Sequence, residues 1–320
     1  MSKRKIGVLL VNLGTPESPT AKDVRPYLRE FLSDPRVIET PKYIWFFILN
    51  LFILTTRPKE SAEKYATVWT DRGSPLLFIT EDQAKLLQET LPENYEVVVA
   101  MRYGQPSIEK GIDELIAKKV DKLIVLPLYP QYCAATTATV FDSVAETLTK
   151  RRYFPELHML SDYYRNPLYI EACKTQIAKN LEGVEIEELV LSYHGMPKST
   201  YEKGDPYYDQ CIETTRLITE SLGRSDIKIT TVFQSKFGKE EWLQPYSFEY
   251  LPSLPSKGVK RVAVFCPGFS ADCLETIEEM GVENRDYFKE QGGEYYQFIP
   301  SLNTESLHIE MMKQIIVDSN

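Results

Sequence analysis

Short runs of apolar residues alternate along the chain with longer segments whose apolar positions recur every three or four residues. The short runs predict buried strands at residues 6–12, 95–101, 121–128, 189–193, 228–233 and 261–266. Continuous Val, Ile and Leu strands separated by helices are typical of parallel sheets that are covered on both faces. We therefore predict an α/β fold made of doubly wound units with right-handed crossovers.

The longer segments predict the helices between these strands. After the first strand, one helical face carries Val24, Tyr27, Leu28 and Phe31. Thr80 and Gln83 have the spacing of a capping box, which predicts the start of a helix that runs towards Leu91. A further helix is expected over residues 107–118, and the pattern restarts after Pro155 with helices beginning at Leu168, Tyr208 and Asp272.

The two halves of the chain resemble each other. "LLVNLGTPES" from Leu9 and "LVLSYHGMPKS" from Leu189 align on Gly-x-Pro-x-Ser and place Leu13 opposite His194. "KLIVLPLYPQY" and "KRVAVFCPGFS" form a second such pair. We predict similar domains at residues 1–160 and 161–320, with the last helix packing back on the first domain. Ligands of such sheets bind beyond the carboxyl ends of the strands, and His194 follows one of those ends.

An apolar segment from Tyr43 to Leu54 lies within residues 41–59 and allows two interpretations. A helix that is apolar on every face is usually buried, which favours a core helix. The alternative is an exposed lip for an apolar ligand or a membrane surface, with Arg57, Lys59 and Lys64 beside it. The segment is too short to span a bilayer, which needs about 20 apolar residues.

Composition argues against several kinds of partner and site. A net charge of −9 argues against nucleic acid as a partner, because phosphate binding requires a basic surface. The apolar start of the chain enters a Gly-Thr-Pro turn, so we interpret it as a strand and not as a signal peptide. The five cysteines are scattered, which makes a disulfide framework or a structural zinc site improbable and indicates a cytoplasmic protein with reduced thiols.

His194 has chemical neighbours that make it a candidate catalytic residue, although an isolated histidine is more often structural. In "ADCLETIEEM", Asp272 suits a helix N-cap, and Glu275 and Glu279 share one helical face. These carboxylates are either a cap and a surface residue or a row that faces His194 and handles protons or metal. Arg102, Tyr129 and Tyr132 would suit a flat apolar ligand that carries carboxylates. The Gly-rich phosphate-binding motifs and the Gly-x-Ser-x-Gly motif are absent from the sequence.

Together, "LSYHGMPKSTYEKGDPYY", "LYPQY" with its following threonines, "VFQSKFGKEEWLQP", "ADCLETIEEM" and the late "SLN" make the chain similar to ferrochelatases. Members of this family insert ferrous iron into a porphyrin to form haem. The resemblance implies two Rossmann-like domains with the porphyrin in the cleft between them. It also implies that His194 and Glu275 are the metal-site pair, supported by Glu279 and Asp272. Around the porphyrin mouth it places Leu13, Arg57, Lys59, Tyr65, Ser74 and Tyr132.

The resemblance leads to further expectations. His194 would accept a pyrrole proton or bind the ion, Glu275 would steer or ligate the ion, and Glu279 would carry protons or metal to solvent. Cys273 stands where many relatives have histidine, so a second histidine is not expected at the metal site. The C-terminal cysteines that hold an iron–sulfur centre in animal relatives have no counterpart after Cys273, so no cluster is expected. Coproporphyrin-type relatives carry tyrosine at the position of Leu13, which together with the apolar lip favours protoporphyrin IX as the substrate. The alternatives are a coproporphyrin ferrochelatase and a non-catalytic porphyrin or haem carrier with His194 as axial ligand. Peripheral contact with the inner face of the membrane is also expected.

Overall fold

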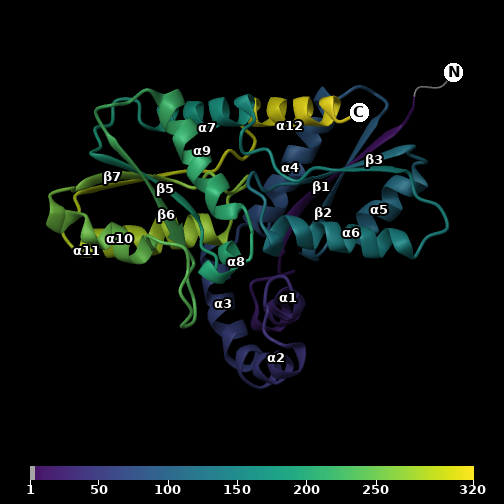
Figure 1. Cartoon of the computed structure of the whole chain (residues 1–320), viewed down its shortest axis with the longest axis horizontal. Coiled ribbons are helices and arrows are strands. Elements are labelled where there is room, and N and C mark those ends of the chain that lie inside the picture. Colours follow the sequence, from purple (N-terminus) through teal and green to yellow (C-terminus); the bar gives the residue numbers. More distant parts are fainter. Residues whose placement is uncertain (1–3) are drawn as a thin grey trace. The chain divides into compact units, whose positions relative to one another are not determined.

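A computed structural model describes residues 4–320 (Figure 1). The contacts divide the chain into two compact units. The N-terminal unit contains the residues up to Asp162 together with Met312–Asn320, and the C-terminal unit is Tyr163–Met311. The last helix, α12 (Ser306–Asp318), begins in the C-terminal unit and ends in the N-terminal one. Lys122 of the N-terminal unit donates to the carbonyl oxygen of Ser319, just beyond this helix, at 2.6 Å.

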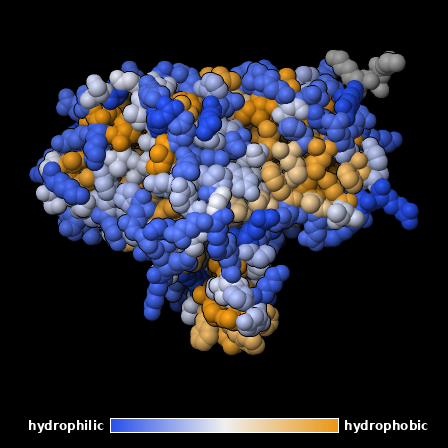
Figure 2. All heavy atoms as spheres, viewed as in Figure 1, coloured by the Kyte–Doolittle hydropathy of each residue, from blue (hydrophilic) through white to orange (hydrophobic). Residues whose placement is uncertain are grey.

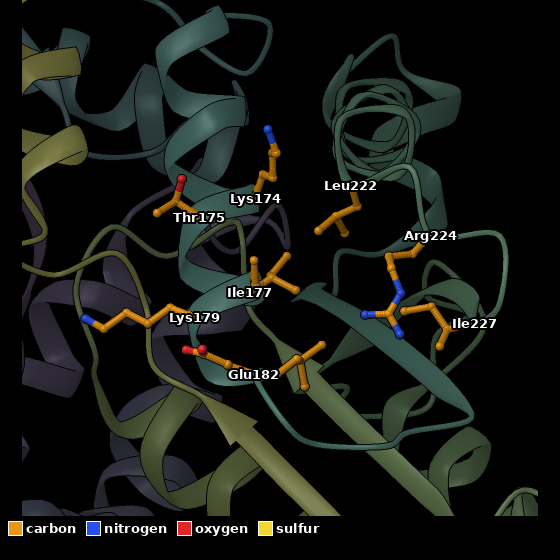
Figure 3. A pocket seen from close by; sticks show the side chains of 10 residues that line it. Lys174, Thr175, Ile177, Lys179, Glu182, Leu222, Arg224 and Ile227 are labelled. Carbon is orange, nitrogen blue, oxygen red and sulfur yellow. The ribbon is translucent and has the colours of Figure 1, made fainter.

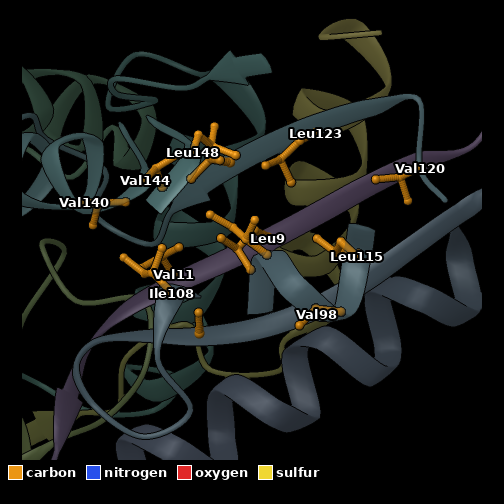
Figure 4. Packing of buried hydrophobic residues seen from close by; sticks show 13 residues of the cluster. Leu9, Val11, Val98, Ile108, Leu115, Val120, Leu123, Val140, Val144 and Leu148 are labelled. Atoms are coloured by element: carbon orange, nitrogen blue, oxygen red, sulfur yellow. The ribbon is translucent and has the colours of Figure 1, made fainter. Parts of the chain in front are cut away.

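A four-stranded parallel sheet organises the N-terminal unit, in the order β2-β1-β3-β4. Its strands are β1 (Ile6–Thr15), β2 (Tyr95–Gly104), β3 (Lys122–Pro127) and β4 (Glu156–Met159). Leu9 and Val11 of the central strand pack with Val98, Ile112 and Val144 in the buried cluster of Figure 4. Because both faces of the sheet carry helices, its central strands read as continuous apolar runs.

The C-terminal unit repeats this arrangement with a parallel sheet in the order β6-β5-β7-β8. Its strands are β5 (Glu188–His194), β6 (Lys228–Gln234), β7 (Arg261–Phe265) and β8 (Tyr295–Ile299). Strands β1 and β5, whose carboxyl ends lead into the two aligned Gly-x-Pro motifs, occupy the same place in their sheets. The predicted α/β fold with two similar units is therefore confirmed, although the pattern had not indicated β4 and β8.

Helices and helical turns of the N-terminal unit connect its strands. They are α1 (Ala21–Ser33), α2 (Lys42–Ile48), η1 (Leu49–Ile53), α3 (Leu54–Val68), α4 (Pro75–Thr90), α5 (Ile108–Ala117), η2 (Ala134–Ala138) and α6 (Thr139–Thr149). The predicted capping box at Thr80 is wrong, because α4 begins a turn earlier. Thr80 is buried inside α4, where its hydroxyl donates to the Leu76 carbonyl at 2.6 Å.

The C-terminal unit contains α7 (Pro167–Asn180), α8 (Lys198–Glu202), α9 (Tyr207–Leu222), α10 (Ser247–Ser253), η3 (Pro255–Lys257), η4 (Glu275–Glu283) and α11 (Asn284–Glu290). The acidic segment η4 is a π-helix and not the α-helix that we predicted from Asp272. A shorter π-helix, η2, follows β3, the strand equivalent to β7. Both units thus place a π-helix after the third strand, and such segments are frequent at functional sites.

The apolar segment from Tyr43 to Leu54 is exposed. Its most exposed side chains are Tyr43, Phe46, Phe47, Leu51 and Phe52, each at 60–72% of full exposure, whereas Leu49 and Leu54 are buried. Figure 2 shows hydrophobic side chains covering the surface of α2. The core-helix interpretation is therefore wrong, and the segment has the exposure that the alternative requires; we call Tyr43–Leu54 the lip. Within the part of the chain that the structure describes, no helix is long and apolar enough to cross a membrane.

Candidate functional site

His194 is the last residue of β5 and lies half-buried at the carboxyl end of the C-terminal sheet. Its Nδ1 lies 2.7 Å from the carbonyl oxygen of Gly195. A carbonyl oxygen accepts hydrogen bonds, so the proton of the neutral ring is on Nδ1 and the Nε2 lone pair remains available. Tyr207, from the Gly-Asp-Pro-Tyr part of the motif, donates to the His194 carbonyl at 3.0 Å. These contacts present Nε2 as a proton acceptor or a metal ligand.

Gly195 allows β5 and β6 to approach each other closely beside the histidine. Its N–H donates to the Gln234 carbonyl at 2.7 Å. A Cβ atom at this position would lie 2.6 Å from that carbonyl oxygen and 3.0 Å from the Trp242 ring. Glycine is therefore needed here for close packing, and this packing holds the carbonyl that orients the His194 ring.

The acidic helix η4 presents Glu279 to the end of β6. Glu279 Oε1 accepts from the backbone N–H of Ser235 at 2.6 Å, and Oε2 accepts from the Ser235 hydroxyl at 2.5 Å. Burial raises the pKa of Glu279, while the Ser235 hydroxyl and the electrostatic effect of His194 act in the opposite direction and Glu275 adds to the rise. His194, Glu275 and Glu279 therefore share one electrostatic environment in the C-terminal unit.

Gln234 connects the histidine strand with the acidic helix. Its side chain is fully buried. The amide oxygen accepts from Ser192 of β5 at 2.7 Å, and the amide nitrogen donates to the Glu275 carbonyl at 2.7 Å and to Glu279 Oε2 at 3.4 Å. Because Ser192 lies on β5 and the two glutamates lie on η4, this one amide holds the strand and the helix in a fixed position relative to each other.

Asp272 has a structural role that its sequence position did not reveal. Its carboxylate accepts from the Thr276 hydroxyl at 3.0 Å, the Ser301 N–H at 3.1 Å and the Asn303 amide at 2.7 Å. The carboxylate thereby ties the start of η4 to the segment that contains the late "SLN" motif. The expected N-cap role is replaced by this bridge, because η4 begins only at Glu275.

Cys273 lies between these acidic residues and is buried. Burial is the largest cause that raises the pKa of its thiol well above the ordinary value, and the nearby Glu275 carboxylate adds to the rise. Burial and the neighbouring carboxylate therefore both favour the neutral form of this thiol. Within residues 4–320 no group of three or more His, Cys, Asp and Glu side chains could hold a metal ion.

The residues expected around the porphyrin mouth all belong to the N-terminal unit. Leu13 and Tyr132 are half-buried, while Arg57 and Lys59 are exposed on α3 next to the lip. Tyr65 is buried in edge-to-face contacts with Tyr27 and Trp69, and Ser74 is buried at the start of α4. The structure thus places Arg57 and Lys59 at exposed positions of α3, while Tyr65 lies on the buried face of the same helix and has the contacts of a packing residue.

A cavity of about 530 Å³ lies elsewhere in the C-terminal unit, between α7, the end of α9 and the start of β6 (Figure 3). Ile177, Leu181 and Ile227 contribute apolar surface to its walls. The cations at its rim already form the ion pairs Lys174–Glu171, Lys179–Glu305 and Arg224–Asp226. The cavity therefore lacks spare positive charge for a ligand with carboxylates and is separate from His194.

Sequence reasoning did not assign a role to Gln234 or Ser235. Both residues belong to the motif "VFQSKFGKEEWLQP" and follow directly from a predicted strand. A polar pair at the carboxyl end of a strand next to β5 was a usable signal. Their partner Glu279 lies more than forty residues away along the chain, so only the tertiary structure revealed the contact.

The chain is similar to known ferrochelatases over nearly its whole length. The family model described as ferrochelatase matches residues 5–320. A ferrochelatase of Idiomarina loihiensis is 54% identical over 98% of this chain and 87% of its own length. One from Alcanivorax borkumensis is 49% identical over 100% and 95%. "Ferrochelatase 2" of Shewanella oneidensis is 49% identical over 98% of each chain. Among solved structures, SirB from Bacillus subtilis with Fe3+ superposes with a TM-score of 0.56 at 11% identity, covering 98% of this chain and 95% of SirB. That likeness concerns the fold alone.

Proposed function

Because the chain belongs to the ferrochelatase family, we propose that it inserts ferrous iron into protoporphyrin IX and releases two protons to form protohaem. The observation that carries this proposal is the orientation of His194. Its Nδ1 is engaged with the Gly195 carbonyl, so Nε2 is the nitrogen that can act on a bound porphyrin. Both the iron and the porphyrin are substrates.

Metal insertion requires the removal of two protons from pyrrole nitrogens and the delivery of a cation to the same place. We propose that His194 Nε2 accepts a pyrrole proton and that Glu275, which begins the acidic helix, attracts or binds the ion. The raised pKa of Glu279 suits a proton carrier, because such a carboxyl group exchanges protons closer to neutral pH than an ordinary glutamate. Glu279 then passes protons on to solvent.

The lip supports a second part of the proposal. Its exposed aromatic side chains, with Arg57 and Lys59 nearby on α3, have the composition of a surface that contacts lipid headgroups and acyl chains. We propose that the protein works in the cytoplasm and binds the inner face of the membrane through Tyr43–Leu54. An apolar substrate would then reach the enzyme from the bilayer.

We propose further that no iron–sulfur cluster takes part. The five cysteines are buried, and burial raises the pKa of Cys173, Cys266 and Cys273. A cluster also needs several cysteines close together, and among the described residues no group of three or more His, Cys, Asp and Glu side chains has an arrangement that could hold a metal ion. Iron analysis of the purified protein, together with its visible absorption spectrum, tests this part.

The deciding experiment mixes the protein with protoporphyrin IX and either ferrous iron under anaerobic conditions or zinc ion. The absorption bands of the porphyrin report metalation. Many turnovers per protein molecule support the proposal. The alternative, a porphyrin or haem carrier, predicts stoichiometric binding without metalation, and that result would exclude the enzyme.

A further inference from the structure

The turn after β6 contains a strained serine whose hydrogen bonds all converge on one carboxylate. Ser235 has a φ of 63°, a conformation that is unfavourable for residues other than glycine, asparagine and aspartate. It nevertheless presents both its N–H and its hydroxyl to Glu279, at 2.6 and 2.5 Å. Strained residues of this kind persist where the surrounding structure requires them, often at functional sites.

The two bonds determine how Glu279 can act. Each of its carboxylate oxygens accepts a hydrogen bond from Ser235, and Oε2 also lies 3.4 Å from the amide nitrogen of Gln234. A carboxylate oxygen offers two lone pairs, so most of the capacity of Oε2 is used by these donors. Glu279 is thus held in one orientation, and the remaining lone pair of Oε1 is its open position.

We propose that Ser235 is a positioning residue that acts through Glu279, and that it sets the direction in which this carboxylate exchanges protons during metal insertion. The inference rests on the proposed function. It assigns to the Ser235 hydroxyl a role in turnover and none in porphyrin binding. Without the hydroxyl, the carboxylate would rotate about its side-chain bonds, and proton transfer would slow because its geometry is lost.

Gln234 is unsuitable for the test, because its buried amide also bonds to Ser192 and to the Glu275 carbonyl. Ser235→Gly is suitable, since glycine removes the hydroxyl, keeps the N–H and adopts the same φ without strain. Ser235→Ala provides a second variant that lacks the hydroxyl. Ser161→Ala is the matched control, because it removes an exposed serine–carboxylate bond of 3.0 Å to Asp162 in the other unit.

The experiment measures kcat and the porphyrin KM of the wild type, the three serine variants, Glu279→Gln and the double variant Ser235→Gly/Glu279→Gln. We expect Ser235→Gly and Ser235→Ala to lower kcat by roughly tenfold, the range typical for residues that orient a functional group, while KM changes by less than about twofold. Ser161→Ala should behave like the wild type. In the Glu279→Gln background, Ser235→Gly should cause no further loss, because its effect passes through Glu279.

Wild-type kcat in both Ser235 variants would overturn the inference and leave the proposed function intact. A loss that is equally large in the Glu279→Gln background would overturn it as well, since Ser235 would then act by another route. A raised porphyrin KM with unchanged kcat would show a binding role and not a positioning one. Absence of turnover in the wild type would overturn the proposed function and, with it, this inference.

Discussion

At the scale of single residues, the hydrogen bond between His194 and its own neighbour Gly195 decides which ring nitrogen is available. The bond uses Nδ1 and leaves Nε2 for chemistry. Glu279 is held on both oxygens by Ser235, whereas Glu275 lies at the first position of η4 and interacts with the Cys273 thiol. We therefore expect large contributions from His194 and Glu275 and a smaller one from Glu279.

His194→Ala should abolish metal insertion, with a loss of at least about a hundredfold in kcat, because a general base contributes this much or more. Porphyrin binding, followed by fluorescence quenching, should stay near the wild-type value. The half-buried ring donates only to the adjacent carbonyl, so the fold should tolerate its removal. Retention of most of the insertion rate would refute the assignment of His194.

Glu275→Gln should reduce insertion about as strongly as His194→Ala, because the amide keeps the shape of the side chain and removes its charge. For Glu279→Gln we expect a milder loss of about tenfold, since water can replace a proton carrier that lies farther from the ring. Steady-state kinetics of both variants under the same iron supply test this order. A larger defect for Glu279→Gln than for Glu275→Gln would reverse our assignment of the two roles.

Leu13 bears on the choice of porphyrin. It offers only packing contacts, whereas additional propionates need cationic or hydrogen-bonding partners, because an unpaired buried carboxylate is costly. We expect kcat/KM to be higher for protoporphyrin IX than for coproporphyrin by at least about tenfold, the scale on which an unmatched polar group is rejected. Parallel assays with both porphyrins measure the ratio. A clear preference for coproporphyrin would contradict the interpretation of Leu13 but not the family assignment.

At the scale of elements, the lip and the π-helices η2 and η4 depart most from regular structure. The lip changes from α2 through the π-helical turn η1 into α3, and it buries Leu49 and Leu54 while it exposes its aromatic residues. Trp45 anchors it, because its indole N–H donates to the Leu32 carbonyl of the preceding segment at 2.6 Å. Because so few side chains of the lip are buried, substitutions at its exposed positions should cost little free energy of unfolding.

Replacing Phe46 and Phe47 with serine should therefore leave the fold intact and weaken two interactions. We expect binding to vesicles that contain anionic lipid to fall by at least about tenfold, because each phenylalanine contributes its buried apolar area. The porphyrin KM should rise as well. Sedimentation with vesicles and steady-state kinetics measure the two effects.

Tyr153→Ser/Phe154→Ser is the matched control for the lip, since these aromatic residues are also exposed in the N-terminal unit but lie outside the lip. The control should bind vesicles like the wild type. An equal loss of vesicle binding in both double variants would show that any exposed aromatic residues support membrane binding, wherever they lie on the unit. Unfolding of the lip variant would contradict the exposed placement of Phe46 and Phe47.

At the scale of the whole molecule, each unit builds its own parallel sheet and its own buried core, and α12 contributes residues to both. His308 of this helix is buried, and its Nδ1 lies 2.8 Å from the Asn303 carbonyl oxygen. Burial lowers the pKa of His308 from its ordinary value of 6.5 to about 4. His308 thus contacts the residue whose side-chain amide bonds to Asp272, and burial keeps its ring neutral.

This histidine should make the C-terminal unit sensitive to acid. Between pH 6.5 and about 4 the unfolded chain binds a proton that the folded chain excludes, so stability is complete above this range and falls as the pH decreases. At about 1.36 kcal/mol per pH unit, the loss reaches about 3 kcal/mol. Urea unfolding of the wild type and His308→Gln at pH 7 and pH 4.5 measures it. The variant should lose less stability on acidification, and an identical loss in both proteins would contradict the role of His308.

Local sequence determined the elements and the family. Apolar runs of five to eight residues are buried by any parallel sheet, so most strands and the repeat of β1 in β5 could be predicted without a partner. The motif around His194 could be recognised in the same way, because a glycine and a proline directly shape the turn that follows the strand.

Contacts between distant residues were decided only by the tertiary structure. A carboxylate that belongs to the cap of an α-helix and one that bridges to another segment look alike in sequence, and Asp272 became a bridge because Asn303 and Ser301 fold beside it. Tyr43–Leu54 has the composition of a core helix, yet the structure buries Leu49 and Leu54 and leaves its aromatic side chains exposed, which composition alone does not determine. The two hydrogen bonds from Ser235 to Glu279 join a turn to a π-helix that lies 44 residues later in the chain. Local conformational propensity carries no information about contacts over such a sequence separation.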